Sequence, residues 1–358
     1  MQGIGIMSSK NNNNSVAALP PTDSWLSRRR ERFLEVSPGL LVAVVVAAGA
    51  TFLSEHYGAP VMLMALLLGM ALGFLHEEGR AVAGIKFTSS TILRIGVALL
   101  GMRITVEQIF SLGGTLMMVV IGAVLLTIAV GVGLSKLLGL GRDFGVLSGG
   151  SVGICGASAA LAISAVLPQD KDAERNTIFT VISVTALSTL AMIVYPILAK
   201  SLGLDDQQAG VFLGATIHDV AQVVGAGYSM SNETGDTATV IKLLRVAMLV
   251  PIVFSLSLLL RRRGGADAGG SKTALPLPLF IIFFVVFVGL NSSGVMPEWS
   301  QKMAIGVSSW CLVTAIAALG MKTSIKALLA VGWRPATLLV TETLFLAALI
   351  LVILKFFV

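Results

Sequence analysis

Ionisable residues inside apolar stretches are costly, so we begin with them as candidates for chemistry. His218 and Asp219 lie near the middle of the apolar segment 209–230, and Gln222 follows three and four residues later, where it neighbours both on a helix surface. A histidine beside an aspartate can relay a proton, because histidine titrates near neutral pH. We expect ion coupling at this stretch, with Thr216 beside it, or sodium binding at Asp219. The alternative is a structural hydrogen-bond network.

Two basic residues, Lys242 and Arg245, lie three residues apart in the next apolar segment and therefore share a helix face. They can attract an anion or pair with Asp219. The alternative, strongest for Lys242, is a side chain that extends to the outer headgroups. Arg94 has the same ambiguity. These bases outnumber the intramembrane acids, chiefly Asp219 and then Glu342, so the interior favours an anionic ligand.

A third feature is the glycine- and serine-rich stretch 147–160 inside the apolar segment 144–167. Each glycine weakens a helix by about 1 kcal/mol relative to alanine, and lipid tolerates a broken helix only inside protein or beside a watery cavity. We predict an interrupted transmembrane helix whose second half starts near Gly153 and aims free N–H groups at the membrane midplane, where an anion can bind. The alternative is a continuous helix in close contact with its neighbours. The residues expected to bind substrate are Ser148, Gly149, Gly150, Ser151, Gly153, Cys155, Gly156, Ser158, Lys242 and Arg245.

Composition restricts the class of protein. The chain has 358 residues, of which 55% are apolar and 12% charged, against about 25% charged in soluble proteins. It is therefore an integral membrane protein, and its long apolar runs predict helices rather than a β-barrel. Two cysteines and three scattered histidines offer no disulfide framework and no metal site. The sequence lacks a phosphate loop and the common hydrolase motifs, so we expect no enzyme activity and no cofactor, and the net charge of +6 reflects topology rather than nucleic-acid binding.

Hydropathy predicts an all-α polytopic protein with eleven transmembrane helices. They cover residues 38–53, 59–75, 88–102, 116–138, 144–167, 178–199, 209–230, 240–260, 277–290, 303–321 and 336–357. With the N-terminus in the cytoplasm, basic residues concentrate in the cytoplasmic loops, and the opposite loops hold only Arg103, Lys171, Arg175 and Lys302. The odd number of spans places the C-terminus outside.

Outside these spans we predict two irregular segments. Residues 1–37 form a disordered cytoplasmic tail before the transmembrane domain 38–358, and residues 261–274 include a glycine-rich cytoplasmic linker. A short echo between residues 98–103 and 317–322, on helices expected to run in opposite directions, fits an inverted repeat or chance.

Two blocks, residues 154–158 (Ile-Cys-Gly-Ala-Ser) and 218–223 (His-Asp-Val-Ala-Gln-Val), together with the Leu-Gly-Met-Arg ending at Arg103, carry a family likeness. They resemble the motifs of a bacterial inner-membrane family labelled as sulfate exporters, and the resemblance covers nearly everything after the N-terminal tail. Many relatives have threonine around position 151 or 152, where this chain has Ser151 and Val152 and keeps one hydroxyl.

The resemblance implies membership of the superfamily of cation–proton antiporters and anion transporters. It implies an inverted repeat with two crossing discontinuous helices, substrate at the crossing, and a homodimer. With the residues above, it favours a secondary transporter that exports a small inorganic anion, sulfate or a related sulfur oxyanion, coupled to H+ or Na+. The alternatives are a cation–proton antiporter that uses Asp219, which the low count of buried acids disfavours, and a channel or a non-transporting scaffold.

Overall fold

The computed structural model describes residues 25–111, 113–168, 171–263, 279–323 and 333–357, and in these ranges every regular element is helical. The first helices are α1 (Trp25–Tyr57), α2 (Val61–Ala71), α3 (Phe74–Glu77), α4 (Val82–Phe87), the π-helical turn η1 (Thr88–Ile92), α5 (Leu93–Leu100), α6 (Val106–Ser111), α7 (Gly114–Leu137), α8 (Arg142–Gly153) and α9 (Ala157–Ser164). The remainder are α10 (Ala173–Ser201), α11 (Asp206–Thr216), α12 (Val220–Met230), α13 (Asn232–Ala247), α14 (Leu249–Arg263), α15 (Leu279–Ser292), α16 (Glu298–Lys322) and α18 (Trp333–Phe357).

Seven of the described helical segments are long and apolar enough to cross a membrane. They cover residues 33–57, 82–100, 114–137, 173–201, 232–260, 298–322 and 333–356. Helices α2 and α15 are apolar but shorter, and α8, α9, α11 and α12 are absent from both groups. The chain is therefore an all-α polytopic membrane protein, as the sequence predicts. The four short helices around the glycine-rich and His-Asp stretches are each too short to cross a membrane alone.

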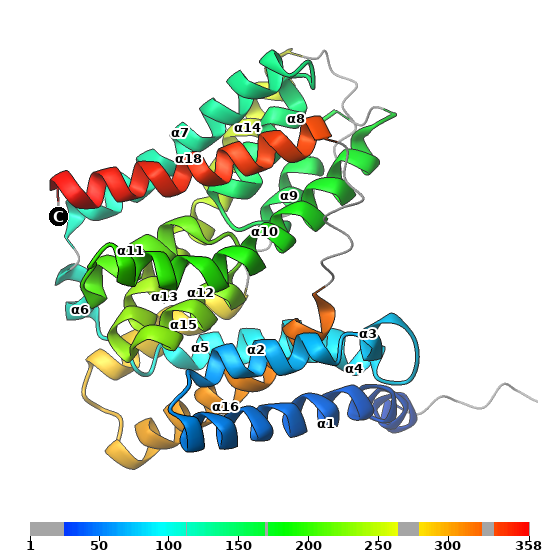
Figure 1. Cartoon of the computed structure of the whole chain (residues 1–358), viewed down its shortest axis with the longest axis vertical. Helices are drawn as coiled ribbons and strands as arrows, with labels where there is room; N and C mark the ends of the chain where they lie inside the picture. Colours follow the sequence, from blue (N-terminus) through cyan, green and yellow to red (C-terminus); the bar gives the residue numbers. More distant parts are fainter. Residues whose placement is uncertain (1–24, 112, 169–170, 264–278, 324–332, 358) are drawn as a thin grey trace, which may run out of the picture.

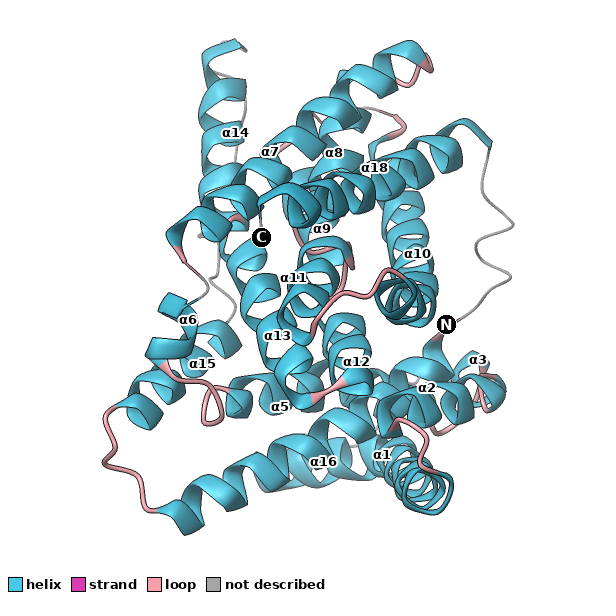
Figure 2. Cartoon of the chain, turned by 60° about the vertical axis from the view of Figure 1, so that its left-hand side comes forward, coloured by secondary structure: helices cyan, strands magenta, loops and turns pink. Residues whose placement is uncertain are grey.

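The helices pack into two bundles (Figures 1 and 2). A support bundle contains α1, α2, α4, η1, α5, α15 and α16, and a hairpin bundle contains α7 to α14 and α18. Close backbone contact holds the support bundle together, since a Cβ atom added to Gly320 on α16 would lie 2.3 Å from the carbonyl oxygen of Leu66 on α2. Helix α12 of the hairpin bundle packs against both α2 and α16, so it forms the main contact between the bundles.

The predicted bounds of the N-terminal tail and of the linker differ from the helix bounds in the structure. Helix α1 begins at Trp25, so helical structure extends into the part of the chain that we assigned to a disordered tail, and residues 1–24 lie outside the described residues. Helix α14 continues to Arg263, and the rest of the predicted linker also lies outside them. The start of α1 and the C-terminal end of α18 lie at opposite ends of the molecule (Figure 1).

The sequence echo at residues 98–103 and 317–322 falls on α5 and α16, which are antiparallel neighbours in the support bundle. The Oγ of Ser308 donates to the Gly96 carbonyl at 2.7 Å, and the amide of Gln301 donates to the Met102 carbonyl at 3.3 Å. The two segments thus run in opposite directions, but this pairing alone does not establish an inverted repeat.

Candidate functional site

Helices α8 and α9 form a hairpin. Arg142, at the start of α8, and Pro168, beyond the end of α9, line the same cavity of about 140 Å3. The two arms touch, because a Cβ atom added to Gly150 would lie 2.2 Å from the Cδ1 of Ile163. The turn between them reaches Gly156, whose φ of +64° lies in a region that favours glycine. We call α8, α9 and this turn hairpin 1.

Helices α11 and α12 form a second hairpin, hairpin 2. The Oγ1 of Thr234 on α13 donates to the carbonyl of Asp206, at the start of α11, at 3.1 Å. A Cβ atom added to Gly235 would lie 2.4 Å from the ring of Tyr228, near the end of α12. Helix α11 therefore begins, and α12 ends, beside the start of α13. The chain reverses between them at the tip formed by residues 217–219.

These hairpins correct two predictions: an interrupted helix that crosses the membrane at 144–167, and an uninterrupted transmembrane helix at 209–230. The arms of hairpin 1 contain 12 and 8 residues, whereas a helix needs about 20 residues to span the hydrocarbon core. Added together the arms have the length of one span, which is why hydropathy counts them as one. The reversal changes which loops share a side, so Lys171 and Arg175 lie at the end of the molecule where α8 begins, and Lys200 lies at the opposite end.

The tips of the two hairpins meet halfway along α10. A Cβ atom added to Gly156 would lie 3.5 Å from the Cβ of His218, and the backbone N–H of Asp219 donates to the Oγ of Ser188 at 3.0 Å. Because the hairpins approach from opposite ends, the second arm of each has its N-terminus at this meeting point. Figure 2 shows α9, α11, α12 and α13 in the middle of the molecule, between α7, α8 and α18 on one side and α1, α2 and α16 on the other.

Lys242 is fully buried between the tips. Its Nζ donates to the carbonyl oxygens of Ile154 at 2.9 Å and Ile217 at 3.0 Å, and also to that of His218. An ammonium group has three N–H donors, and all three have a carbonyl partner. The charge therefore stabilises the two turns and is not free to bind a ligand.

Arg245 lies about one helical turn after Lys242 on α13 and donates to carbonyl groups at the carboxyl ends of α8 and α11. Its Nε donates to the Gly153 carbonyl at 2.8 Å and its Nη2 to that of Val152 at 2.7 Å, while Nη1 contacts the carbonyls of Gly214 and Ile217 at 3.1 and 3.0 Å. The carboxyl end of a helix carries a partial negative charge, which a cation stabilises. The prediction that Lys242 and Arg245 bind substrate therefore gives way to a role in joining the hairpins, and burial also excludes extension to the headgroups.

A cavity of about 470 Å3 lies at the amino ends of α9 and α12, the second arms of the two hairpins. Its polar lining comes from both bundles and consists of Ser89, Ser90, Arg94, Cys155, Ser158, Thr185, Thr189, Asp219, Lys322 and Thr323. Arg94, Ser158 and Lys322 are exposed, so the cavity is open to its surroundings. We refer to the end of the molecule at Ser89 and Lys322 as the cavity end.

The electrostatics of this cavity are predominantly positive. Ala157 and Ser158 at the start of α9, and Val220 and Ala221 at the start of α12, line it. The first N–H groups of a helix have no partner within that helix, and neither N-terminus has a side-chain cap. With Arg94 and Lys322 in the same cavity, the N–H groups at the start of α9 provide hydrogen-bond donors for an oxyanion, whereas those of Val220 and Ala221 also interact with the Asp219 carboxylate beside them.

Most other residues predicted from the glycine-rich stretch lie in helix contacts. Ser148 donates to Glu342 on α18, and Ser151 donates to the Leu147 carbonyl in its own helix. Gly149 and Gly153 face the backbone of α7, and Gly150 faces the second arm of the hairpin. Of the ten predicted substrate residues, only Cys155 and Ser158 line the cavity, and Gly156 shapes the turn between them.

The residues predicted for ion coupling lie in different surroundings within hairpin 2. Asp219 lines the cavity, whereas His218 is fully buried and its Nε2 lies 3.0 Å from the Oγ1 of Thr343 on α18. Gln222 is buried and donates to Thr189 at 3.4 Å, and Thr216 donates to the Phe212 carbonyl at 2.6 Å. The adjacent His218 and Asp219 thus have separate surroundings, and the structure gives no direct bond between them.

Sequence reasoning missed several residues of this region. Thr185, Thr189 and Lys322 line the cavity, and Thr343 contacts hairpin 2. The three threonines lie in segments without a local motif, and the echo that ends at Lys322 gave no indication of a binding site. For Glu342 a signal existed, because it is an acid inside an apolar segment. The structure locates it beside hairpin 1, away from the cavity lining.

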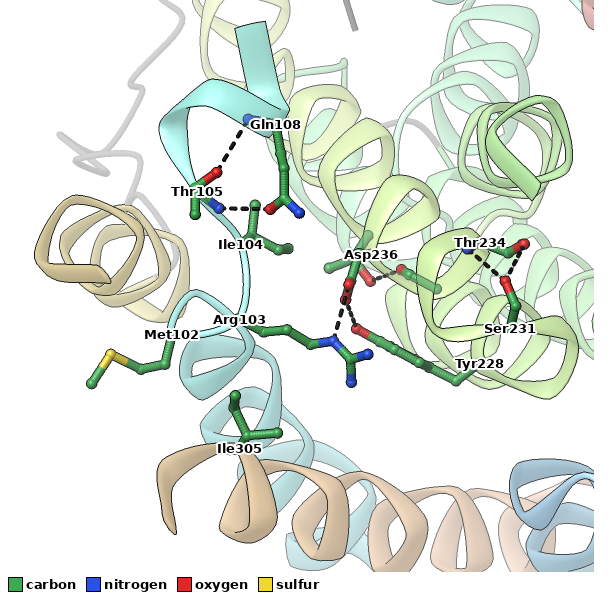
Figure 3. A network of polar contacts seen from close by, with 12 residues as sticks. Met102, Arg103, Ile104, Thr105, Gln108, Tyr228, Ser231, Thr234, Asp236 and Ile305 are labelled. Carbon is green, nitrogen blue, oxygen red and sulfur yellow. Dashed lines mark hydrogen bonds and ion pairs between the residues drawn. The ribbon is translucent and has the colours of Figure 1, made fainter. Parts of the chain in front are cut away.

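At the end of the molecule opposite the cavity, a polar contact joins the two bundles (Figure 3). The Nε of Arg103, just beyond α5, lies 2.9 Å from the carboxylate of Asp236 on α13. Asp236 also accepts a hydrogen bond from the hydroxyl of Tyr228, and the Arg103 guanidinium stacks over the Tyr228 ring at 5.5 Å. We call Arg103, Tyr228 and Asp236 the far-end clamp.

The described residues contain no group of His, Cys, Asp and Glu side chains arranged to hold a metal ion. Both cysteines are free thiols, with Cys155 buried in the tip of hairpin 1 and Cys311 half-buried on α16.

Comparison with known proteins identifies relatives over nearly the whole chain. Residues 38–339 match a family described as conserved hypothetical protein 698. A UPF0324 membrane protein of Chlorobaculum tepidum is 65% identical over 89% of this chain and 89% of its own length. One from Rhizobium meliloti is 53% identical over 91% of this chain and 96% of its own length, and the UPF0324 membrane protein TauZ of Paracoccus pantotrophus is 53% identical over 88% and 94%. No solved structure matches the chain.

Proposed function

We propose a transport function for this chain, which belongs to the family described as conserved hypothetical protein 698. It is a secondary transporter that moves a small anion, sulfate or a related sulfur oxyanion, across the bacterial inner membrane. One observation carries this proposal: the amino ends of α9 and α12 open into a single cavity together with Arg94 and Lys322. Discontinuous helices that point their N-termini at a common site near the membrane midplane are a recognised way to bind anionic substrates.

The partners of Lys242 and Arg245 support an anion over a sodium ion as ligand at the tips. In transporters with broken helices, carbonyl groups at the carboxyl ends of half-helices can coordinate Na+. In this chain the side chains of Lys242 and Arg245 already donate to those carbonyls. We therefore favour coupling to protons over coupling to sodium.

The second candidate function is cation–proton antiport. Asp219 favours it, because this residue lines the cavity and its carboxylate is available to a cation. Arg94 and Lys322 in the same cavity oppose the entry of a cation. If antiport is correct, an imposed proton gradient drives sodium or potassium flux that Asp219→Asn abolishes, and oxyanions have no effect on it.

The distribution of basic residues suggests that the cavity end faces the cytoplasm. The cavity end holds Arg80, Lys86, Lys136, Arg142, Lys171, Arg175, Lys322 and Arg334, and the far end holds Arg103, Lys200, Lys302 and Lys355. Cytoplasmic loops of membrane proteins are enriched in Lys and Arg. The cavity would then receive its anion from the cytoplasm, as export requires, and nine helical segments would cross the membrane with two hairpins inserted from opposite sides.

Transport then requires the two bundles to move relative to each other. The cavity lies between them, and the far-end clamp holds them together on the opposite side. Alternating access follows if the far-end clamp opens while the cavity end closes. Helix α12, which packs against the support bundle, would be the pivot of this movement.

Radiolabelled anion flux in proteoliposomes tests the proposal. We expect uptake of sulfate, sulfite, thiosulfate or a small organic sulfonate above that of empty vesicles. Arg94→Gln is expected to raise the half-saturating concentration roughly tenfold, because a charged hydrogen bond contributes about 1.5–3 kcal/mol. Arg80→Gln is the matched control, since Arg80 is exposed and does not line the cavity. Absence of flux for all four anions would reject the function.

A further inference from the structure

Glu342 on α18 is a carboxyl group enclosed by the hairpin bundle. Its side chain has no exposed surface, and its Oε1 accepts a hydrogen bond from the Oγ of Ser148 at 2.7 Å. Its Oε2 is buried and has no hydrogen-bond partner. Among the described residues no cation forms an ion pair with it.

Helix α7 approaches the Glu342 carboxyl group closely. A Cβ atom added to Gly131 on α7 would lie 2.4 Å from the Oε1, so this glycine permits the approach of the carboxyl group. The nearest ionisable side chain that contacts α18 is His218, which bonds to the adjacent Thr343. The charged residues of α18 and of the helices packed against it lie in their end turns and are Lys136, Arg142, Asp143, Glu174, Arg175, Lys200, Asp206, Arg334 and Lys355.

A carboxylate in such a place is costly, because burial removes its hydration and no charge replaces it. A neutral carboxyl group with a proton on Oε2 avoids this cost. Asp219 differs in this respect, since it lines an open cavity that also contains Arg94 and Lys322. Glu342 is therefore the acid whose protonation the structure most directly requires.

Helix α18 contacts both hairpins through consecutive residues. Glu342 accepts from Ser148 of hairpin 1, and Thr343 bonds to His218 of hairpin 2. A movement of the hairpins that admits water to Glu342 would allow the proton to leave, and their return would require a proton to be bound again. Proton binding at Glu342 and the position of the hairpins are thus thermodynamically linked.

We propose that Glu342 is the proton-binding site that couples transport to the proton gradient, with Ser148 as its positioning residue. This inference rests on the proposed transport function and supplies its coupling ion. In the step itself, the O–H bond of the carboxyl group breaks and the proton passes to water on one side of the membrane. The bond forms again with a proton from water on the other side, and no electrons are transferred.

Infrared difference spectroscopy of the protein in nanodiscs tests proton binding without any need for transport. We expect wild-type protein to show the carbonyl band of a protonated carboxyl group, and this band to disappear when the pH is raised. Glu342→Gln should remove this band, Ser148→Ala should retain it with a shifted midpoint, and the exposed control Glu298→Gln should leave it unchanged. A band of the same amplitude in folded Glu342→Gln protein, or the same midpoint in Ser148→Ala, would overturn the assignment.

Proteoliposome flux then tests coupling. We expect a pH gradient to accelerate net anion flux several-fold in wild type, while Glu342→Gln retains anion exchange at equal pH and loses the acceleration. Full gradient dependence in Glu342→Gln would contradict the inference. If wild type moves no anion while the infrared band behaves as expected, the transport function fails and the proton site stands, so the two failures can be told apart.

Discussion

At the scale of single residues, Lys242 and Arg245 have the largest effect on the site. They are the largest charged side chains that are fully buried in the structure, and together they bond to carbonyls of both hairpins. They compensate the partial negative charge at the carboxyl ends of α8 and α11, and the positive amino ends of α9 and α12 face the cavity. The preference of the site for an anion thus depends on residues that do not touch the anion.

Replacing Lys242 tests this role. We expect Lys242→Met to lower stability by about 3–5 kcal/mol, because the carbonyl groups of Ile154 and His218 lose their donor while that of Ile217 keeps only Arg245. Thermal unfolding in detergent measures the change. Lys302→Met is the control, since Lys302 is exposed and forms only a surface ion pair of 3.5 Å. Equal stability of the two variants would show that Lys242 is not structural.

At the scale of helices, the hairpins depend on glycines where the backbones make contact. A Cβ atom added to Gly214 on α11 would lie 2.5 Å from the Ala238 carbonyl oxygen on α13, whereas one added to Gly133 on α7 would meet no atom within 4 Å. We expect Gly214→Ala to destabilise the protein by about 1–3 kcal/mol through overpacking, and Gly133→Ala to be neutral or slightly stabilising. Unfolding temperatures of the two variants check this difference, and a tolerated Gly214→Ala would argue against the close packing of hairpin 2.

The hairpin topology places Lys171 and Lys200 on other sides of the membrane than a topology of eleven crossing helices does. If α8 and α9 crossed the membrane as one helix, Lys171 would lie outside and Lys200 in the cytoplasm. The hairpin reverses both positions. We expect Lys171→Cys to react with a membrane-impermeant thiol reagent only from the cytoplasmic face, and Lys200→Cys only from the outer face, in a background without Cys155 and Cys311. The opposite pattern would restore the crossing helix.

Sequence alone predicted the polytopic helical class and an interruption in the glycine-rich stretch correctly, but it did not predict the second interruption, between α11 and α12. It failed at the connection between the arms, because two short apolar helices that turn back have the same hydropathy as one helix that crosses. It identified the buried cations but not their partners, since backbone carbonyls leave no signature in sequence. Lys322 and Thr189 were missed for a related reason: only the packing of α16 and α10 brings them to the cavity.

At the scale of the whole molecule, the proposed transport requires the two bundles to separate at the far end when they close at the cavity end. Arg103 and Asp236 join the bundles there, and their side chains are 23% and 19% exposed. The pair is therefore only partly screened by solvent and is a suitable contact for a reversible closure.

Charge reversal tests this clamp. We expect Arg103→Asp to reduce anion flux several-fold and to increase labelling of a cysteine placed at the far end, because two like charges repel across the contact. The double variant Arg103→Asp with Asp236→Arg should recover most of the flux and close the far end again. Lys302→Asp, at the same end but outside the clamp, should have little effect. No recovery in the double variant would mean that the pair does not form the closure.

The central claim is that an anion binds where the amino ends of α9 and α12 meet. A cryo-electron microscopy map of the protein in nanodiscs with saturating sulfate tests it most directly. We predict tetrahedral density in hydrogen-bond contact with the N–H groups of Ala157 and Ser158 at the start of α9, and loss of that density in Arg94→Gln. Density for a cation at Asp219 with no oxyanion at these N–H groups, or sulfate bound only elsewhere, would contradict it.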